Sequence, residues 1–356
     1  MIKDAFYDPT KSYYDNYNEG PFGAFADGEV LDTKTPKSYH FLGKEVNSLF
    51  GIPAGPLLNA KFVKAALDKG FDLPIYKTVR SGVHESHAYP NVLPVDVEGD
   101  LTLEMADNGL ITKEDYTDPL SITNSFGVPS YKPEVWQEDF SQAINHAKNG
   151  QRVGLSFQGT KWPDATLEQY LEDWVLTARL AAETKPDFLE ANLSCPNEGT
   201  TALLCFDVDR VKLIAERVKA EIGDTPLLLK ISYFKDNELL EKLVKETGAM
   251  VDGYSTINTI SSAVRKPDGE QALPGEGRLR SGVCGKSIKW AGLEMVERFV
   301  GLRKKHNLNF SVVGVGGVVG VEDYHKYIEA GADAVMSATG AMWNPYLAKE
   351  IKQSLN

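Results

Sequence analysis

The sequence predicts an α/β fold, a single (β/α)8 TIM barrel with an antiparallel excursion over its C-terminal face and an N-terminal extension. From about Gly51 onward, short apolar runs alternate with amphipathic stretches of helical periodicity. Eight such runs can be counted, and parallel strands need crossover connections, which are usually helices. Eight units of this kind close most naturally into a barrel, and 356 residues suit one barrel with additions.

The elements follow in a regular order. Residues 1–45, rich in Tyr, Asp, Asn and Gly, contain no long periodic segment, and we expect this extension to wrap the barrel or cap one end. The barrel is expected over residues 46–356. Its strands are predicted at 51–54, 74–78, 152–157, 188–193, 227–232, 251–256, 310–315 and 333–338. Helices are predicted at 166–183, 207–222 and 237–248.

One connection is too long for a simple loop between a strand and a helix. Residues 81–130 contain pieces of alternating polarity, such as VLPVDVEGDLTLEM. We expect a small antiparallel excursion there, above the barrel. Long excursions on this fold usually build the face that carries the active site.

Composition and charge argue against several classes of protein. Hydrophobic residues make up 42% of the chain and charged residues 25%, as in globular proteins. A net charge of -12 argues against a nucleic-acid surface, which needs clustered Lys and Arg. No apolar signal segment is visible near the start, and the apolar run at 312–321 is too short to span a bilayer. We therefore expect a cytoplasmic protein without an integral membrane segment.

The cysteines and histidines do not suggest a metal site. Cys195, Cys205 and Cys284 form no CxxC pair, and His84 and His87 lack the spacing of a zinc motif. We expect no metal, and we expect Cys205 and Cys284 to be structural.

The candidate chemistry lies at the carboxyl ends of the strands, where this fold places reactive groups. Lys77, Lys230 and Asn258 follow predicted strands, Asn124 precedes the third strand, and NLSCPN at 192–197 follows the fourth. No carboxylate or histidine joins them, which disfavours hydrolysis by paired acids and metal-assisted chemistry. Carboxamides offer both donors and an acceptor, so they suit a flat ligand edge such as that of a pyrimidine.

The last two strands end differently. GVGG at 314–317 and SATG at 337–340 are glycine-rich. This fold commonly binds a phosphate there, on backbone N–H groups and a short helix N-terminus. One half of the barrel mouth is therefore predicted to bind a planar ligand and the other a phosphorylated cofactor.

These motifs resemble those of the dihydroorotate dehydrogenases. The resemblance runs from about residue 48 to the C-terminus and rests on YKT (76–78), NSFG (124–127), NLSCPN (192–197), LKI (229–231), TIN (256–258) and GVGG (314–317). It implies FMN as cofactor and oxidation of dihydroorotate to orotate in pyrimidine biosynthesis.

The resemblance also implies roles for single residues. Cys195 resembles the general base of the soluble class, Lys77 the lysine near flavin and substrate, and Lys230 the lysine beside the flavin pyrimidine. Substrate contacts are implied for Lys77, Asn124, Asn192, Asn197 and Asn258. Cofactor contacts are implied for Ala54, Gly55, Lys77, Thr78, Asn124, Ser156, Asn192, Lys230, Gly282, Gly316, Gly317, Ala338 and Thr339. Ser281 and Cys284 stand where the family frequently has glycine, and Ala338 where it often has glycine.

Several alternatives stay open at this point. Fumarate is favoured as electron acceptor over a quinone, or over NAD used through a partner subunit. A flavin oxidoreductase acting on an uncharged dihydropyrimidine and a barrel that binds ligands without turnover are the competing functions. The oligomeric state is open, with a homodimer as one option.

Overall fold

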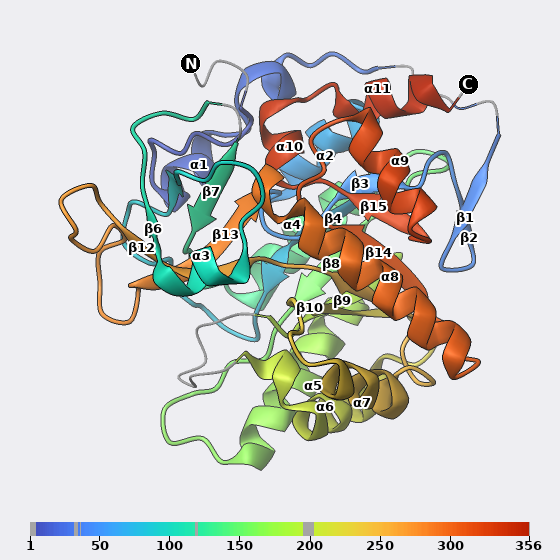
Figure 1. Ribbon diagram of the computed structural model, residues 1–356. Helices are drawn as coiled ribbons and strands as arrows, with labels where there is room; N and C mark the ends of the chain where they lie inside the picture. Colours follow the sequence, from blue (N-terminus) through green and yellow to red (C-terminus); the bar gives the residue numbers. More distant parts are fainter. Residues whose placement is uncertain (1–4, 32–34, 36, 118–119, 195–202, 356) are drawn as a thin grey trace.

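Eight parallel strands form a closed barrel at the centre of the molecule (Figure 1). The computed structural model describes residues 5–31, 35, 37–117, 120–194 and 203–355. The barrel strands are β3 (Phe50–Ile52), β4 (Leu73–Val79), β8 (Gly154–Phe157), β9 (Phe188–Asn192), β10 (Leu227–Ile231), β11 (Gly253–Thr256), β14 (Ser311–Val315) and β15 (Ala334–Met336). Each overlaps one of the eight predicted strands, so the predicted TIM barrel is confirmed.

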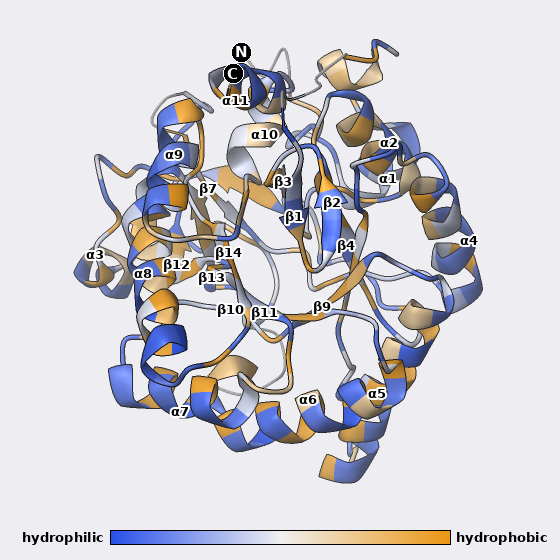
Figure 2. Ribbon diagram, turned by 90° about the vertical axis from the view of Figure 1, so that its right-hand side faces the viewer, coloured by the Kyte–Doolittle hydropathy of each residue, from blue (hydrophilic) through white to orange (hydrophobic). Residues whose placement is uncertain are grey.

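Helices surround the barrel as an outer ring (Figure 2). They are α2 (Ala60–Asp68), α4 (Pro133–Ile144), α5 (Leu167–Glu183), α6 (Val208–Ile222), α7 (Asn237–Thr247), α8 (Lys289–Lys305), α9 (Val321–Glu329) and α11 (Leu347–Ser354). The three predicted helices are confirmed as α5, α6 and α7. Their starts follow capping chemistry: Thr166 and Gln169 form a capping box, and Asp236 accepts from the first backbone N–H groups of α7.

The barrel interior changes character along its axis. Apolar side chains fill the lower part, among them Leu73, Ile75, Phe188, Leu228 and Val313. Toward the carboxyl ends of β4, β9 and β10, the positions that continue this inward-facing pattern are the polar residues Lys77, Asn192 and Lys230. The polar end of the barrel is thus built by the same strands that form its apolar core.

The N-terminal segment reaches both ends of the barrel. The hairpin of β1 (Tyr39–Phe41) and β2 (Lys44–Val46) places Phe41 and Val46 in the interior apolar cluster, where the Phe41 ring packs on Phe188. Before it, α1 (Tyr13–Glu19) lies on the side of the polar end, and η1 (Gly23–Ala26) packs against α2, with the Phe25 ring 6.3 Å from that of Phe71. At the polar end, the ring centroids of Tyr7 and Phe126 are 5.8 Å apart.

A second sheet stands beside the barrel mouth. Its order is β5-β7-β13-β12-β6, and α3 (Leu103–Asn108) packs against it. The strands are β5 (Val92–Pro94), β6 (Leu110–Ile111), β7 (Ser121–Asn124), β12 (Ile260–Arg265) and β13 (Arg280–Gly285). The predicted excursion is confirmed, but two of the five strands of its sheet, β12 and β13, come from a second excursion after β11 that was not predicted from the sequence. All pairings are antiparallel except that of β12 with β6.

Short elements complete the fold. They are η2 (Leu204–Phe206), η3 (Lys286–Ile288) and α10 (Thr339–Trp343), which directly follows the last barrel strand. Within the described ranges, no helix combines the length and apolarity needed to cross a membrane.

A buried ion pair ties the C-terminal helix to the barrel. Lys352 Nζ in α11 lies 2.7 Å from Asp72 Oδ2, and the two side chains are 4% and 0% exposed. Burial raises the pKa of Asp72, while the Lys352 ammonium lowers it. The Ser48 hydroxyl donates to the same carboxylate at 2.5 Å. The pair joins the last helix to the residue that precedes β4.

We expect Lys352→Met to lower the free energy of unfolding by about 3 to 5 kcal/mol, because it leaves the buried Asp72 carboxylate without its cation. Lys326→Met, which removes a solvent-exposed pair with Glu322, should change it little. Urea unfolding measures both variants. The double variant Asp72→Asn/Lys352→Met should recover part of the loss. Equal losses in the two lysine variants would contradict the importance of the buried pair.

Candidate active site

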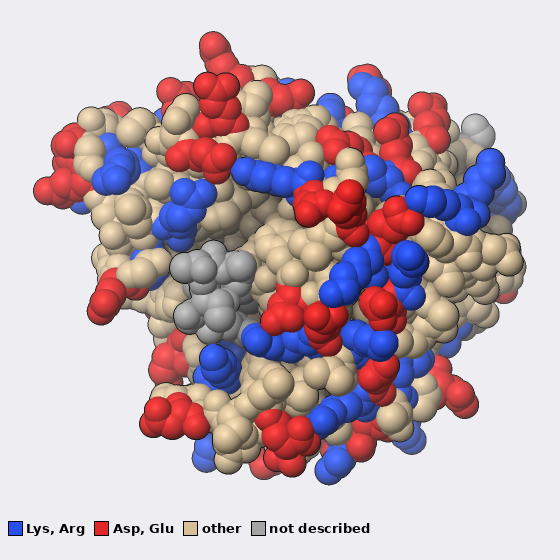
Figure 3. Space-filling view, turned by 60° about the horizontal axis from the view of Figure 1, so that its bottom comes forward, with Lys and Arg blue, Asp and Glu red and all other residues tan. Residues whose placement is uncertain are grey.

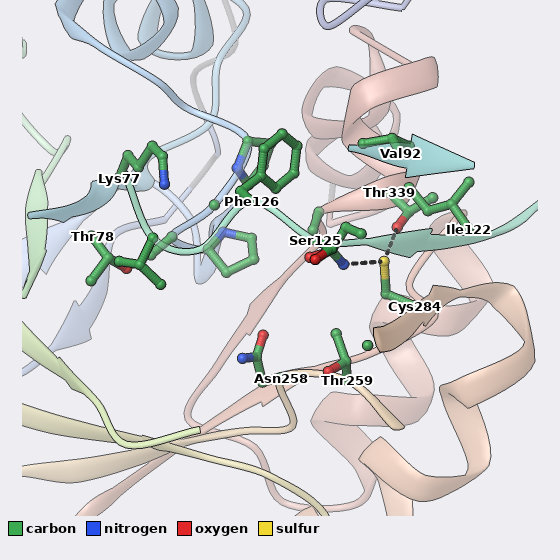
Figure 4. A pocket seen from close by; sticks show the side chains of 18 of the residues that line it. Lys77, Thr78, Val92, Ile122, Ser125, Phe126, Asn258, Thr259, Cys284 and Thr339 are labelled. Carbon is green, nitrogen blue, oxygen red and sulfur yellow. Dashed lines mark hydrogen bonds between the residues drawn. The ribbon is translucent and has the colours of Figure 1, made fainter. Parts of the chain in front are cut away.

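A cavity opens at the carboxyl ends of the barrel strands. Its walls come from the barrel, from both excursions and, through Tyr7, from the N-terminal segment. In Figure 4, Lys77 and Thr78 lie on the opposite side of this cavity from Cys284 and Thr339. The cavity therefore depends on segments that are far apart in the sequence.

The charge of the cavity is one-sided. Lys77, Lys230 and Arg280 line it, and no Asp or Glu is found among the described lining residues. The outer surface differs, since Figure 3 shows a face on which acidic and basic side chains are intermixed. A ligand with negative charge is thus favoured within the cavity.

The two lysines are buried. Lys230, on β10, is 4% exposed, and its Nζ donates to the Ala54 carbonyl at 3.2 Å, just beyond β3. Lys77, on β4, is 6% exposed, and its Nζ lies 5.6 Å from the centroid of the Tyr13 ring. A single neutral acceptor such as the Ala54 carbonyl only partly offsets the cost of burying the Lys230 ammonium group. An anionic ligand would offset more of it.

Three of the four predicted asparagines converge on the same cavity. Asn192, which ends β9, donates its Nδ2 to Gln158 Oε1 at 3.1 Å. The Nδ2 group of Asn258 donates to the Ser194 carbonyl at 3.3 Å, and that of Asn124 reaches Cys284 Sγ at 3.5 Å. These contacts fix the planes of the three amides. Asn197 and Cys195 lie outside the described residues.

A narrower arm continues from the cavity between β14 and β15. The arm and the cavity share Asn258, Cys284, Val315, Ala338 and Thr339, and Gly316 and Gly317 line the arm itself. Gly317 has a φ of +67°, and a Cβ there would lie 2.8 Å from the backbone nitrogen of Lys289. Helix α10 begins at Thr339, and the N–H groups of a first turn lack intrahelical acceptors. This arm fits the phosphate of a cofactor such as FMN.

The remaining predicted cofactor contacts fall into two groups. Ala54, Gly55, Thr78 and Gly282 line the main cavity. Ser156 is fully buried and is not among the described lining residues; its Oγ lies 3.0 Å from Thr78 Oγ1, so it supports a residue of the wall.

Cys284 occupies a position that sequence analysis missed. It lines both the cavity and the arm, and its Sγ accepts from Asn124 and, at 3.4 Å, from Thr339 Oγ1 (Figure 4). Burial raises the pKa of its thiol. Cys205, by contrast, is buried in the core, and burial raises its pKa to about 12. A structural role was expected for both cysteines. The position of Cys205 in the core agrees with it, whereas Cys284 lies on the wall of the cavity.

The histidines of the first excursion belong to its loop. His87 Nδ1 lies 3.1 Å from Ser125 Oγ. Across the described part of the chain, no group of three or more His, Cys, Asp or Glu side chains is placed to hold a metal ion.

We expect Gly317→Ala to destabilise the protein more than Gly277→Ala. Both glycines have positive φ, +67° and +72°, which costs an alanine about 1 to 2 kcal/mol. A Cβ at Gly277 meets nothing within 4 Å, whereas a Cβ at Gly317 collides with Lys289, which adds about 1 to 3 kcal/mol. Urea unfolding of both variants measures the difference. Equal losses would show that the turn at Gly317 has more room than its contacts indicate.

The chain is similar in sequence to known proteins of one family. A family model described as dihydroorotate dehydrogenase matches residues 114–356. Dihydroorotate dehydrogenase of Dictyostelium discoideum is 38% identical over 98% of this chain and 96% of its own length. The catalytic subunit of dihydroorotate dehydrogenase B (NAD(+)) of Maridesulfovibrio salexigens is 32% identical over 51% of this chain and 57% of its own.

The name of a third relative includes fumarate instead of NAD(+). The putative dihydroorotate dehydrogenase A (fumarate) of Pediococcus pentosaceus is 29% identical over 52% of this chain and 59% of its own. The family match covers most of the barrel, and the Dictyostelium relative spans nearly the whole chain. The chain belongs to the dihydroorotate dehydrogenase family, whose members are flavin-dependent oxidoreductases acting on a CH–CH bond.

Proposed function

We propose that this protein oxidises dihydroorotate to orotate in pyrimidine biosynthesis, with FMN as its cofactor. The observation that carries the proposal is the cavity in which buried cations and carboxamides converge while no described lining residue is acidic. Dihydroorotate is an anionic pyrimidine with alternating N–H and C=O groups. Its carboxylate suits the lysines, and its ring edge suits the amides of Asn124, Asn192 and Asn258.

The residues of this chain would hold FMN along the whole length of the site. Gly316, Gly317 and Thr339 would receive the phosphate in the arm, and Lys230 and Ala54 would lie beside the ring system in the cavity. When bound, the flavin supplies the acceptor of a hydride.

The chain supplies the base and the charges. Cys195 would take the proton from the ring carbon next to the carbonyl, and the electron pair of that bond would form the new double bond as hydride leaves the neighbouring carbon. The ammonium groups of Lys77 and Lys230 would stabilise negative charge on the bound ligands. This assignment of Cys195 rests on its place in the NLSCPN motif.

Fumarate is the acceptor we propose. A dicarboxylate suits a cavity lined by cations, and it can occupy the position that the product orotate leaves. The name of the Pediococcus relative includes fumarate, whereas that of the Maridesulfovibrio relative includes NAD(+).

The direct test is anaerobic reduction of the bound flavin by dihydroorotate, followed by reoxidation with fumarate, a soluble quinone or NAD in turn. We expect bleaching by dihydroorotate and recovery with fumarate. Bleaching by dihydrouracil alone would indicate an enzyme for uncharged dihydropyrimidines. Purified protein that is colourless and takes up no added FMN would indicate a binding protein without turnover.

We expect Cys195→Ser to slow flavin reduction by about 10² to 10⁴, the usual contribution of a positioned base, without loss of bound FMN. In the wild type the rate should rise with pH as the thiolate fraction grows, since an ordinary cysteine has a pKa of about 8.5. Stopped-flow bleaching measures both effects.

Cys205→Ser is the matched control, because Cys205 lies in the core and not on the cavity wall. It should leave the rate of flavin reduction nearly unchanged. A wild-type rate in Cys195→Ser at every pH would assign the base to another group.

Asn258→Ala should weaken orotate binding by about 5- to 150-fold, because a ligand group left unpaired in a buried site costs about 1 to 3 kcal/mol. Asn149→Ala, at an exposed position outside the cavity, should not change it. Titration of orotate against the flavin spectrum gives both affinities. If Asn258→Ala binds like the control, this amide does not contact the ring.

A further inference from the structure

Glu190 is a buried carboxyl group inside the barrel, beneath the cavity. It lies on β9 between Phe188, which belongs to the interior apolar cluster, and Asn192, which lines the cavity. Alternate residues of a strand face the same side, so Glu190 points into the barrel as well. It is 0% exposed, and neither of its carboxyl oxygens has a hydrogen-bond partner in the described structure. Such a group requires an explanation.

Lys230 lies above Glu190 on the neighbouring strand. In the register between β9 and β10, Glu190 is paired with Leu228, and Asn192 with Lys230. Two residues of strand rise about 7 Å, so Lys230 starts one layer closer to the mouth. Its inward side chain and that of Glu190 therefore occupy adjacent layers of the interior.

Lys77 lies near the level of Glu190 on the other side. Ser156 on β8 is the register partner of Glu190. Leu155, one residue earlier, is the partner of Tyr76, and Lys77 follows Tyr76 directly. Lys77 and Glu190 are thus two strands apart, which is about 10 Å between backbones. The Glu190 carboxyl group therefore lies close to the strand positions of both buried lysines, Lys77 and Lys230.

We propose that Glu190 is the internal counter-charge of the cavity, which offsets the two lysines from beneath and limits how tightly the site holds anions. This inference rests on the proposed function, in which the product orotate is an anion. At an effective dielectric constant of about 20, unit charges 10 to 15 Å apart can change a binding constant by about tenfold. Without this carboxylate, orotate would bind more tightly and leave more slowly.

The test is the orotate affinity of the FMN-loaded Glu190→Gln variant, which keeps the shape of the side chain and removes its charge. We expect orotate to bind about tenfold more tightly than to the wild type, and the uncharged methyl ester of orotate to bind with unchanged affinity. Because the charges are buried, the gain should persist at high salt. Glu216→Gln, at an exposed position on α6, makes the same change in net charge and should have no effect.

The outcomes separate the two proposals. If the wild type binds no orotate, the proposed function fails and the inference falls with it. If the wild type binds orotate, and the ratio of orotate affinity to ester affinity is the same in Glu190→Gln as in the wild type, only the role of Glu190 is overturned. Equal weakening of both ligands would show a packing role and would also overturn it. Should Glu190→Gln fail to fold, Glu190→Met makes the same charge change and must show the same shift in the ratio.

Discussion

Burial of two ammonium groups at the mouth of a closed barrel is the constraint on which the rest of this structure depends. Parallel strands bring their carboxyl ends to one edge, so Lys77 on β4 and Lys230 on β10 face a common space. The Ala54 carbonyl accepts a hydrogen bond from Lys230, and the Tyr13 ring faces the Lys77 ammonium group. A bound anion therefore stabilises the mouth further, which links the stability of the mouth to the ligand it takes.

The shape of the cavity depends on pairing between distant segments. Gly282 of β13 is the register partner of Asn124 of β7, and both residues line the cavity. Arg278 fastens the two excursions, since its guanidinium donates to the carbonyls of Ala88 at 2.8 Å and Ser125 at 3.1 Å. A wall held by backbone carbonyls keeps its position without adding an acidic group near the site. The hydrogen bonds of Arg278 thus hold the outer wall together, and the charged residues of the described lining remain cations.

The difference between the locally determined barrel and the long-range pairing of the cavity wall explains what the sequence could predict. Barrel strands and helices follow from local periodicity, and residues such as Lys230 and Asn192 follow from their place at strand ends. The sheet shared by β7 and β13 could not be predicted, because its register is set by a partner about 160 residues away. For the same reason Cys284 and Tyr7 were not predicted as wall residues: the sequence does not show which distant segments form the wall with them. The roles of all the predicted site residues stay predictions, and for Cys195 and Asn197, which lie outside the described residues, so do their positions.

The contrast between the whole chain and its cavity has a physical consequence. A net charge of -12 would repel an anionic pyrimidine at long range, but salt screens exposed charges beyond about 8 Å at physiological ionic strength. Many surface carboxylates are also paired with cations, as Glu168 is with Arg217. Buried charges such as Lys230 are screened far less, so they determine the potential that a ligand meets inside the barrel. Preference for an anion is consequently a local property of the barrel mouth, set by a few inward-facing side chains and independent of the acidity of the protein as a whole.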